Sequence, residues 1–470
     1  MPPRSIVRNA ISRLQPTAHS LQPIGRVIVL ALSLVLSASA LAEPTEPPTA
    51  FEGGYEKPVS VQPDPVWDGW AYVDVTVLSL FLVLGTMFLH AMRSRRAVRG
   101  LSIVALAYFG FFRHGCVCAV GAVQNVALAI GQGQLWSSDA MTYAVPIPVL
   151  AMFVIPLVWT LFAGRVFCGA VCPMGAIQDL VHLRSFRVPS WVDAGLRLMA
   201  VAVLLAAVLL AALGAAFIIC AYDPFVGFFR LSGPAAILLA GGAVLALGMV
   251  VGRPFCRWAC PYGVLLAAAG RLSKPIPLNI SPTVCVTCRL CERICPVDAI
   301  STPASTGPID ADARRRARRS MAWAVLAVPV LVAAGAVGGA LAGSAVANVH
   351  PTVRAAVYVA ADQGKPADAI SDATRAARQA KNEDGLLESA DSVRRQFVWG
   401  TSVAAAVFGL AVGGTLISLS RRRANAHYEV NAARCVSCAR CYSACPVGRR
   451  RGNGEALAET NDVERKSKTD

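Results

Sequence analysis

The sequence predicts an all-α polytopic membrane bundle of about seven spans after a signal peptide, together with a small cytoplasmic module. Two observations support this prediction. Hydrophobic residues make up 55% of the 470 residues and charged residues only 15%, whereas about a quarter of the residues in soluble domains are charged. The apolar residues also fall in long runs that reach or approach the length needed to cross a bilayer as a helix.

The net charge of +16 is explained by the same membrane prediction. In a soluble chain such a charge would indicate binding to nucleic acid. Here the basic residues cluster beside the ends of apolar runs, where the positive-inside rule places arginine and lysine on the cytoplasmic side. We therefore expect the lipid bilayer, and no nucleic acid, as the partner of this charge.

Residues 1–42 are predicted to be a signal peptide or an N-terminal anchor. The apolar stretch within them ends in Ala40-Leu41-Ala42, which has the A-x-A form of a cleavage site. An uncleaved anchor remains the alternative. Residues 43–70 are rich in proline and are expected to form a short, irregular periplasmic segment.

The membrane core, residues 71–270, is predicted to contain five spans. Their approximate positions are 71–92, from 101 outward, 145–163, 196–219 and 235–251. Two further spans form a transmembrane hairpin, 321–420, whose periplasmic loop at 344–397 is mixed in charge and is expected to be helical.

The arginine clusters beside the spans give the orientation. With this number of spans, clusters such as Arg314 to Arg319 and Arg421 to Arg423 all face the same side. That side is the cytoplasm by the positive-inside rule. We therefore expect a multi-pass protein of the bacterial inner (cytoplasmic) membrane with a cytoplasmic C-terminus.

A run of four cysteines and a proline occurs twice, in the predicted cytoplasmic segments 271–320 and 421–470. Both copies read C-x2-C-x2-C-x3-C-P, the spacing of bacterial ferredoxins that hold cubane iron–sulfur clusters. Three closely spaced thiolates wrap three corners of a cube, and the fourth stands apart. The sequence therefore predicts two [4Fe-4S] clusters on these residues: Cys285, Cys288, Cys291, Cys295, Cys435, Cys438, Cys441 and Cys445. Structural zinc remains the alternative, because C-x2-C pairs also bind zinc.

The separation of the two runs predicts how they combine. In two-cluster ferredoxins the fourth cysteine of each run ligates the cluster of the other run. Antiparallel neighbouring helices pack about 8–10 Å apart, so the hairpin at 321–420 can bring its two ends together. We expect a ferredoxin-like two-cluster module in which Cys445 joins the first run and Cys295 joins the second. Closure of each run on its own four cysteines is the simpler alternative.

A second cysteine pattern repeats inside the membrane core. Residues 164–175 and 252–263 both read G-R-x-F-C-x3-C-P-x-G, each at the end of a predicted span. Two cysteines at i and i+4 project from one face of a helical turn, and the proline favours a new helix start. The two pairs together would supply four thiolates for a further cluster or metal: Cys168, Cys172, Cys256 and Cys260. Packing at the membrane edge, with no ligand, is the alternative.

A degenerate third copy lies in the second predicted span. Residues 114–124 match 168–178 with histidine in place of the first cysteine. The preceding Arg113 falls inside the span, where a charge is costly and usually functional. A cysteine ends the fourth span at the same predicted depth. The candidates for a metal site near the outer face are therefore His114, Cys116, Cys118 and Cys220. A packed polar kink with ordinary buried cysteines is an equal alternative.

Taken together, these motifs resemble the NosR and NapH group of membrane polyferredoxins. The resemblance covers roughly residues 101–300 and the tail around 435–446. It implies electron transfer between the quinone pool or cytoplasm and periplasmic reductases of denitrification, and NosR-type proteins are also implicated in maturing nitrous-oxide reductase. Two features depart from the group: residues 43–70 are too short for the flavin-binding domain of NosR, and residues 296–434 separate runs that usually lie close together.

From the motifs and the resemblance we expect an electron carrier subunit rather than an enzyme with its own substrate. The expected partner is a periplasmic reductase or electron-transfer protein, with quinol as a further candidate. Two other classes of function stay open. One is an assembly or regulatory factor for a copper-related metalloenzyme of the periplasm or membrane. The other is a structural zinc-binding membrane protein.

Overall fold

Helices dominate the structure, a computed structural model, and this confirms the predicted helical class. The structure describes residues 69–115, 119–131, 145–183, 185–273, 285–303, 311–362, 383–420 and 427–446. Within these residues four helices are long and apolar enough to cross a membrane, and three shorter apolar helices accompany them. The predicted signal peptide or anchor, 1–42, and all but the last two residues of the segment 43–70 lie outside the described residues.

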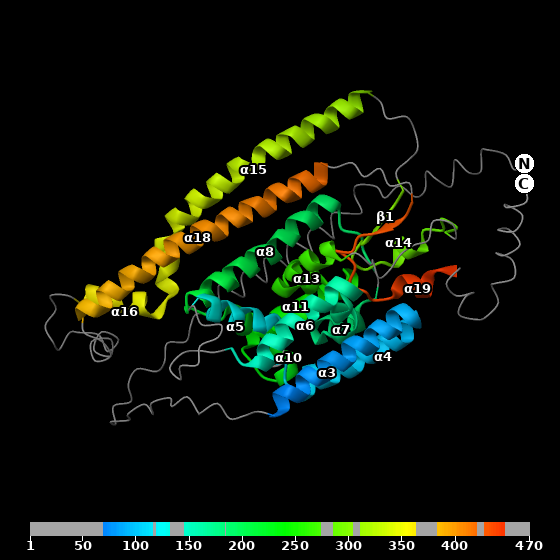
Figure 1. Ribbon diagram of the computed structural model, residues 1–470, viewed down its shortest axis with the longest axis horizontal. Helices are drawn as coiled ribbons and strands as arrows, with labels where there is room; N and C mark the ends of the chain where they lie inside the picture. The colour runs from blue at the N-terminus through cyan, green and yellow to red at the C-terminus, as the bar shows by residue number, and fades with distance from the viewer. Residues whose placement is uncertain are drawn as a thin grey trace, which may run out of the picture.

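Helices from the first part of the chain build the core of the bundle (Figure 1). They are α3 (Gly69–Thr86), η2 (Met87–Ala91), α4 (Arg95–Ala105), η3 (Leu106–Phe112), α5 (Ala119–Gly131), α6 (Ile147–Ala163), α8 (Ser190–Ala212), α11 (Ala235–Val250) and α13 (Pro261–Leu272). One apolar cluster joins most of them, and it contains Leu82 and Phe229 together with Cys168, Cys172 and Cys260. Cysteines of the repeated C-x3-C-P pattern therefore belong to the packed core of the molecule.

The second predicted span differs from the expectation. The helix begins at Arg95 rather than near Leu101, continues through η3 to Phe112, and then breaks before α5. His114 and Gly115 both have positive φ angles, 52° and 66°. Successive residues in that region cannot continue a right-handed helix. The break falls at the degenerate third copy of the cysteine pattern.

Two long helices, α15 (Ala311–Val346) and α18 (Glu383–Ser420), pack along each other as a hairpin (Figure 1). A Cβ added to Gly335, Gly339 or Gly409 would lie 2.3 Å from a carbonyl oxygen of the other helix. Backbones approach this closely only through small residues, as is usual between helices in membranes. Both helices are longer than predicted, with 36 and 38 residues, so they include the two ends of the segment 344–397.

The two ends of the bundle carry different structures (Figure 1). At one end, η5 (Ala347–Val349) and α16 (Pro351–Ala361) form a small apolar cluster with α18 and the end of α8. At the other end lie the short elements of the cysteine runs: α14 (Leu290–Ile294), β1 (Ile300–Ser301), β2 (Glu429–Val430) and α19 (Arg440–Ala444). The two strands pair antiparallel, with Ile300 opposite Val430.

Candidate functional site

The two cysteine runs lie against each other at one end of the bundle. Helices α14 and α19, which carry the third cysteine of each run, are in contact. The β1–β2 pair joins the chain after the first run to the chain before the second. The hairpin of α15 and α18 thus returns the chain to its starting point, as the sequence predicted.

The fourth cysteine of each run lies with the other run. One hollow is lined by four cysteines: Cys295, Cys435, Cys438 and Cys441. The rest of its lining is mostly apolar, with Val297, Ile300 and Val430 among the residues. In the second group, three cysteines lie close enough to Cys291 to influence its charge: Cys285, Cys288 and Cys445. This is the crossed arrangement expected from two-cluster ferredoxins.

The donor set of each group, four thiols, fits a bound iron–sulfur cluster. Burial raises the pKa of Cys435 to about 12, and Cys438 and Cys295 add to the rise. Burial also raises the pKa of Cys441. Such thiols keep their protons at neutral pH unless a metal replaces them, and thiolate sets suit iron–sulfur clusters. Among the residues described, no three His, Cys, Asp or Glu side chains are close enough together to hold a single metal ion.

The two C-x3-C-P elements also meet. The first consists of η4 (Phe167–Val171) and α7 (Pro173–Val181), and the second of α12 (Pro254–Trp258) and α13. Gln178 of the first donates from Nε2 to Sγ of Cys256 over 3.2 Å. Its Oε1 accepts the backbone N–H of Phe255 over 3.1 Å. Burial raises the pKa of Cys256 to about 11, and the nearby Cys168 thiol adds to the rise.

The contacts between the two elements are reciprocal. A Cβ added to Gly175 of the first would lie 3.2 Å from Nη1 of Arg253 in the second, and one added to Gly263 of the second would lie 3.6 Å from Nη2 of Arg165 in the first. Arg253 also donates to the backbone oxygen of Cys168. The arginine and the glycine that the sequence repeats are therefore complementary parts of one interface, which the spacing alone did not show.

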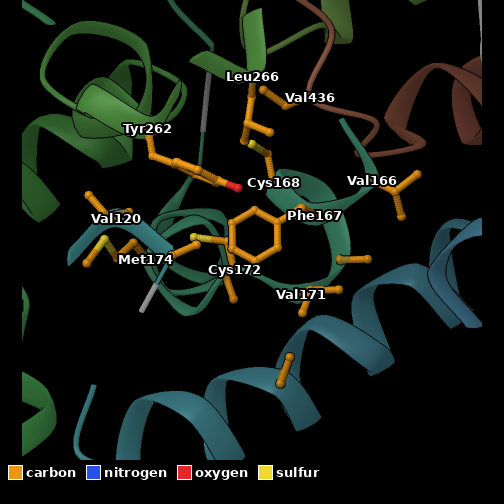
Figure 2. Packing of buried hydrophobic residues seen from close by; sticks show 14 of the residues in the cluster. Val120, Val166, Phe167, Cys168, Val171, Cys172, Met174, Tyr262, Leu266 and Val436 are labelled. Atoms are coloured by element: carbon orange, nitrogen blue, oxygen red, sulfur yellow. The ribbon is translucent and has the colours of Figure 1, made fainter. Parts of the chain in front are cut away.

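Each C-x3-C-P element touches one of the ferredoxin-type runs. A Cβ on Gly169 would lie 2.5 Å from the carbonyl oxygen of Val436, and one on Gly252 would lie 2.3 Å from that of Pro296. Figure 2 shows Cys168 and Phe167 of the first element beside Val436 of the second run and Tyr262 of α13. The segments that carry the three groups of cysteines are therefore in direct backbone contact.

Asp179 on α7 joins these parts electrostatically. Its carboxylate accepts from Arg253 over 2.8 Å, from Arg440 of the second run over 3.3 Å, and from Arg95 of α4 over 3.4 Å. Although burial opposes it, the charge and hydrogen bonds of Arg253 hold the pKa of Asp179 well below its usual range. Sequence reasoning missed this residue. The available signal was an acidic residue directly after Gln178 in an apolar stretch, because a carboxylate there needs a partner.

Asp193 at the start of α8 has a similar role for the first run. It accepts hydrogen bonds from Arg257, from Trp258 over 3.0 Å, and from Arg197 over 2.8 Å. Arg257 in turn donates to Asp298, directly after the first run, over 2.9 Å. This residue was also missed in the sequence, where it lies outside every cysteine motif.

The degenerate third copy is only partly described. Cys116 and Cys118 lie outside the described residues, and His114 lies at the break after η3. Gln124, the counterpart of Gln178, accepts the backbone N–H of Cys220 over 3.3 Å. Arg113 pairs with the fully buried Asp74 over 2.7 Å, so an ion pair accounts for this charge. A metal site at this copy stays a prediction.

The chain matches two families, each described as a 4Fe-4S binding domain. One matches residues 145–190 and 232–279, which contain both C-x3-C-P elements. The other matches residues 278–301, which contain the first ferredoxin-type run. Neither match includes the second run at 435–446.

Three relatives show how far the similarity extends. Protein NirI of Paracoccus denitrificans is 34% identical over 165 residues, 31% of this chain and 24% of that protein. The putative electron transport protein YccM of Escherichia coli is 25% identical over 194 residues, 38% of this chain and 52% of YccM. The regulatory protein NosR of Pseudomonas aeruginosa is 28% identical over 258 residues, 48% of this chain and 34% of NosR. The chain thus spans about half or less of these relatives. No solved structure matches it.

Proposed function

Because this chain belongs to a NosR/NapH-like family of membrane proteins with 4Fe-4S binding domains, we propose that it passes electrons between the cytoplasm or quinone pool and a periplasmic redox partner. In this proposal it is an electron carrier and has no substrate of its own. Its C-terminus and the cysteine-rich end of the bundle face the cytoplasm. The partner is a reductase or electron-transfer protein of the periplasm.

The observation that carries the proposal is the direct contact between the segments that carry the three groups of cysteines. The first run with Cys445 would hold one cluster, and the second run with Cys295 another. The repeated elements would hold a third group on four cysteines: Cys168, Cys172, Cys256 and Cys260. When bound, such clusters supply one-electron exchange.

The residues around the thiols prepare this end of the molecule for electron transfer. Apolar side chains such as Val297 and Val430 exclude water from the hollow of the second run. Arg165 and Arg253 place positive charge beside Cys168, which offsets the negative charge of bound thiolates. Gly169 and Gly252 keep the backbones of successive groups in contact. Together these features shorten the distance between sites and stabilise charge there.

The test is a redox titration of the anaerobically purified full chain, with iron and sulfide counted on the same sample. We expect iron and sulfide in equal amounts and electron paramagnetic resonance signals that appear on reduction. The proposal also predicts that the periplasmic partner is no longer reduced in membranes that lack the chain. Zinc in place of iron, with no visible absorption, would contradict the proposal and support the structural zinc alternative.

A second candidate function is favoured by the names of two relatives. NosR of Pseudomonas aeruginosa and NosR of Stutzerimonas stutzeri are each called a regulatory protein. In this alternative the chain supports assembly or regulation of a copper-related metalloenzyme. Metal content of the periplasmic enzyme separates the two. An electron carrier leaves the enzyme fully loaded but unreduced when the chain is deleted, whereas an assembly factor leaves it short of metal.

A further inference from the structure

A large cleft separates the cysteine-rich end of the bundle from the last membrane helix. It has a volume of about 720 Å³ and lies between α8, α13, α18 and the start of the second run. One part of its wall is apolar, with side chains from three helices: Leu198, Val201, Val264, Val407 and Leu410. Another part is strongly basic, with Arg165, Arg197, Arg257, Arg271 and Arg434. The wall is therefore amphipathic, which neither the electron-transfer proposal nor the cysteine motifs explain.

The positive charge of this wall is only partly compensated. Among the described residues that line the cleft, five are arginines and none is acidic. Asp193 reaches Arg197 and Arg257 from outside the lining, and Asp298 reaches Arg257 over 2.9 Å, so two carboxylates face five arginines. The charges of Arg257 and Arg434 both act on Arg197, so like charges are held close together there. Gathering cations beside apolar surface is costly unless an anion accompanies them.

Two of these arginines also keep unused hydrogen-bond donors. Arg165 and Arg257 are 5% and 7% exposed. The Nε of Arg165 and the Nη1 of Arg257 are buried and have no hydrogen-bond partner. A buried guanidinium N–H without an acceptor costs free energy, and the oxygen of a neighbouring anion would accept its hydrogen bond.

From these observations we infer that the cleft binds one anionic phospholipid, with its phosphate among the arginines and an acyl chain against the apolar wall. Basic pockets between membrane helices bind phosphate-bearing lipid head groups on the cytoplasmic side. Arg271 and Ser418 line the cleft near the ends of α13 and α18, at the end of the bundle that the arginine clusters predict to be cytoplasmic. A phosphate would pair with the arginines of the basic wall, and an acyl chain would pack against the apolar wall. A neutral ring with carbonyl groups would leave the arginine charge uncompensated.

The lipid would lie beside the repeated cysteine pattern, because Cys256 and Cys260 also line the cleft. A bound phosphate there adds negative charge next to these thiols. It would stabilise the more oxidised state of any cluster that they hold, a consequence that rests on the proposed function. The binding of lipid itself does not depend on that function.

The test is lipid retention by the full chain, purified in detergent and measured by native mass spectrometry. We expect one phosphatidylglycerol per chain to survive washing, and phosphatidylcholine to be retained far less. R271Q and R434Q should each weaken phosphatidylglycerol binding roughly fivefold, from about 1 kcal/mol for each basic residue at a lipid surface. The control is R394Q, because Arg394 lies on α18 and pairs with Asp391 near the other end of the bundle. It should bind like the wild type.

Several outcomes would overturn the inference. Equal retention of phosphatidylcholine would show that charge is not recognised. Displacement of the lipid by inorganic phosphate at low concentration would show a free-anion site instead. A quinone analogue that displaces lipid equally from the wild type and R271Q would show a neutral ligand. Loss of binding in R394Q to the same extent would show general attraction to a basic protein. Circular dichroism of each variant checks that it is folded.

Discussion

Two regions of the molecule use the same glutamine contact and differ in what surrounds it. The first is the pair of C-x3-C-P elements at 164–175 and 252–263, here called the repeat pair. There Gln178 binds the backbone N–H of Phe255 and the sulfur of Cys256. In the second, here called the degenerate pair, Gln124 binds the backbone of Ile219 and Cys220, but its Nε2 is buried without a partner. Gln124 and Gln178 occupy matching positions of the repeated sequence, and each binds another segment of the chain in a similar way.

The difference between the pairs lies in their charges. Around the repeat pair, Arg253 and Arg165 approach the cysteines and Asp179 fixes Arg253 in place. Around the degenerate pair, Arg113 is bound to Asp74. Thiolates that hold a metal need nearby positive charge in a buried place. The comparison therefore supports the proposed cofactor at the repeat pair. At the degenerate pair, the contact of Gln124 joins two segments, and the metal site stays a prediction.

The largest effect is expected for loss of a thiol at the repeat pair. C256A and C168A should each remove the same cluster, about four iron atoms per chain for a cubane. C220A should keep the cluster of the repeat pair, because Cys220 contacts Gln124 and not Gln178. Iron counting and electron paramagnetic resonance of the three purified variants check this. Equal iron loss in C220A would assign a cofactor to the degenerate pair, and full iron in both C256A and C168A would remove it from the repeat pair.

The next largest difference is expected in the loss of unfolding free energy when each of two ion pairs is broken, Arg253–Asp179 and Arg113–Asp74. D179N leaves Arg253, which is 1% exposed, without its carboxylate, and breaking such a pair costs about 3–5 kcal/mol of unfolding free energy. D74N leaves Arg113, which is 23% exposed, and should cost about 1–2 kcal/mol because solvent screens the remaining charge. Denaturant unfolding in one detergent compares the two. A larger loss in D74N would contradict the assigned roles.

A smaller difference in stability is expected between alanine substitutions of two glycines at matching positions, Gly175 and Gly121. A Cβ on Gly175 would lie 2.7 Å from the backbone oxygen of Cys168, whereas one on Gly121 would lie 3.4 Å from Sγ of Cys220. G175A should therefore destabilise the protein by about 1–3 kcal/mol through overpacking. G121A should stay within about 1 kcal/mol of the wild type, since alanine is the better helix residue. Thermal unfolding of both variants tests this, and equal midpoints would mean that the repeat pair is not packed as described.

At neutral pH the smallest effect comes from the thiols themselves. Burial raises the pKa of Cys435 from 9.0 to about 12 in the folded chain. A raised pKa contributes stability that is fully present below the unfolded value and is lost as pH rises towards the folded value. The cluster-free chain should thus lose stability between about pH 9 and pH 12 and change little near pH 7. Unfolding midpoints across this range test it, with the iron-loaded chain as control. A loss that begins below pH 8 would contradict it.

The cysteine spacings predicted more of this molecule than the apolar runs did. The runs at Cys285 and Cys435 are 150 residues apart in sequence, yet their crossed arrangement followed from the hairpin and the ferredoxin rule. The break at His114 did not follow, because hydropathy does not report backbone conformation. The hairpin of α15 and α18 was predicted, but its packing through glycines was not, although Gly335, Gly339 and Gly343 recur every fourth residue.

The main feature that the sequence did not predict is the pair of acidic residues, Asp179 and Asp193, that organise the charges around the site. Asp179 binds arginines from three segments far apart in the sequence, and Asp193 binds Arg257 of α12 besides Arg197 of its own helix. Their partners are set by the three-dimensional packing of α7, α8 and α12, so no single motif contains them. A lone acidic residue in an apolar stretch indicates that a partner exists but not which arginine it is.

The exchange of the fourth cysteines is the central structural claim, and paired variants test it most directly. Electron paramagnetic resonance spectra of four anaerobically purified and reduced variants are needed: C288A, C438A, C445A and C295A. Each spectrum shows which cluster signal is missing. The crossed arrangement predicts that C445A loses the same signal as C288A, and that C295A loses the same signal as C438A. If C445A instead matches C438A and C295A matches C288A, each run closes on its own cysteines and the account is contradicted.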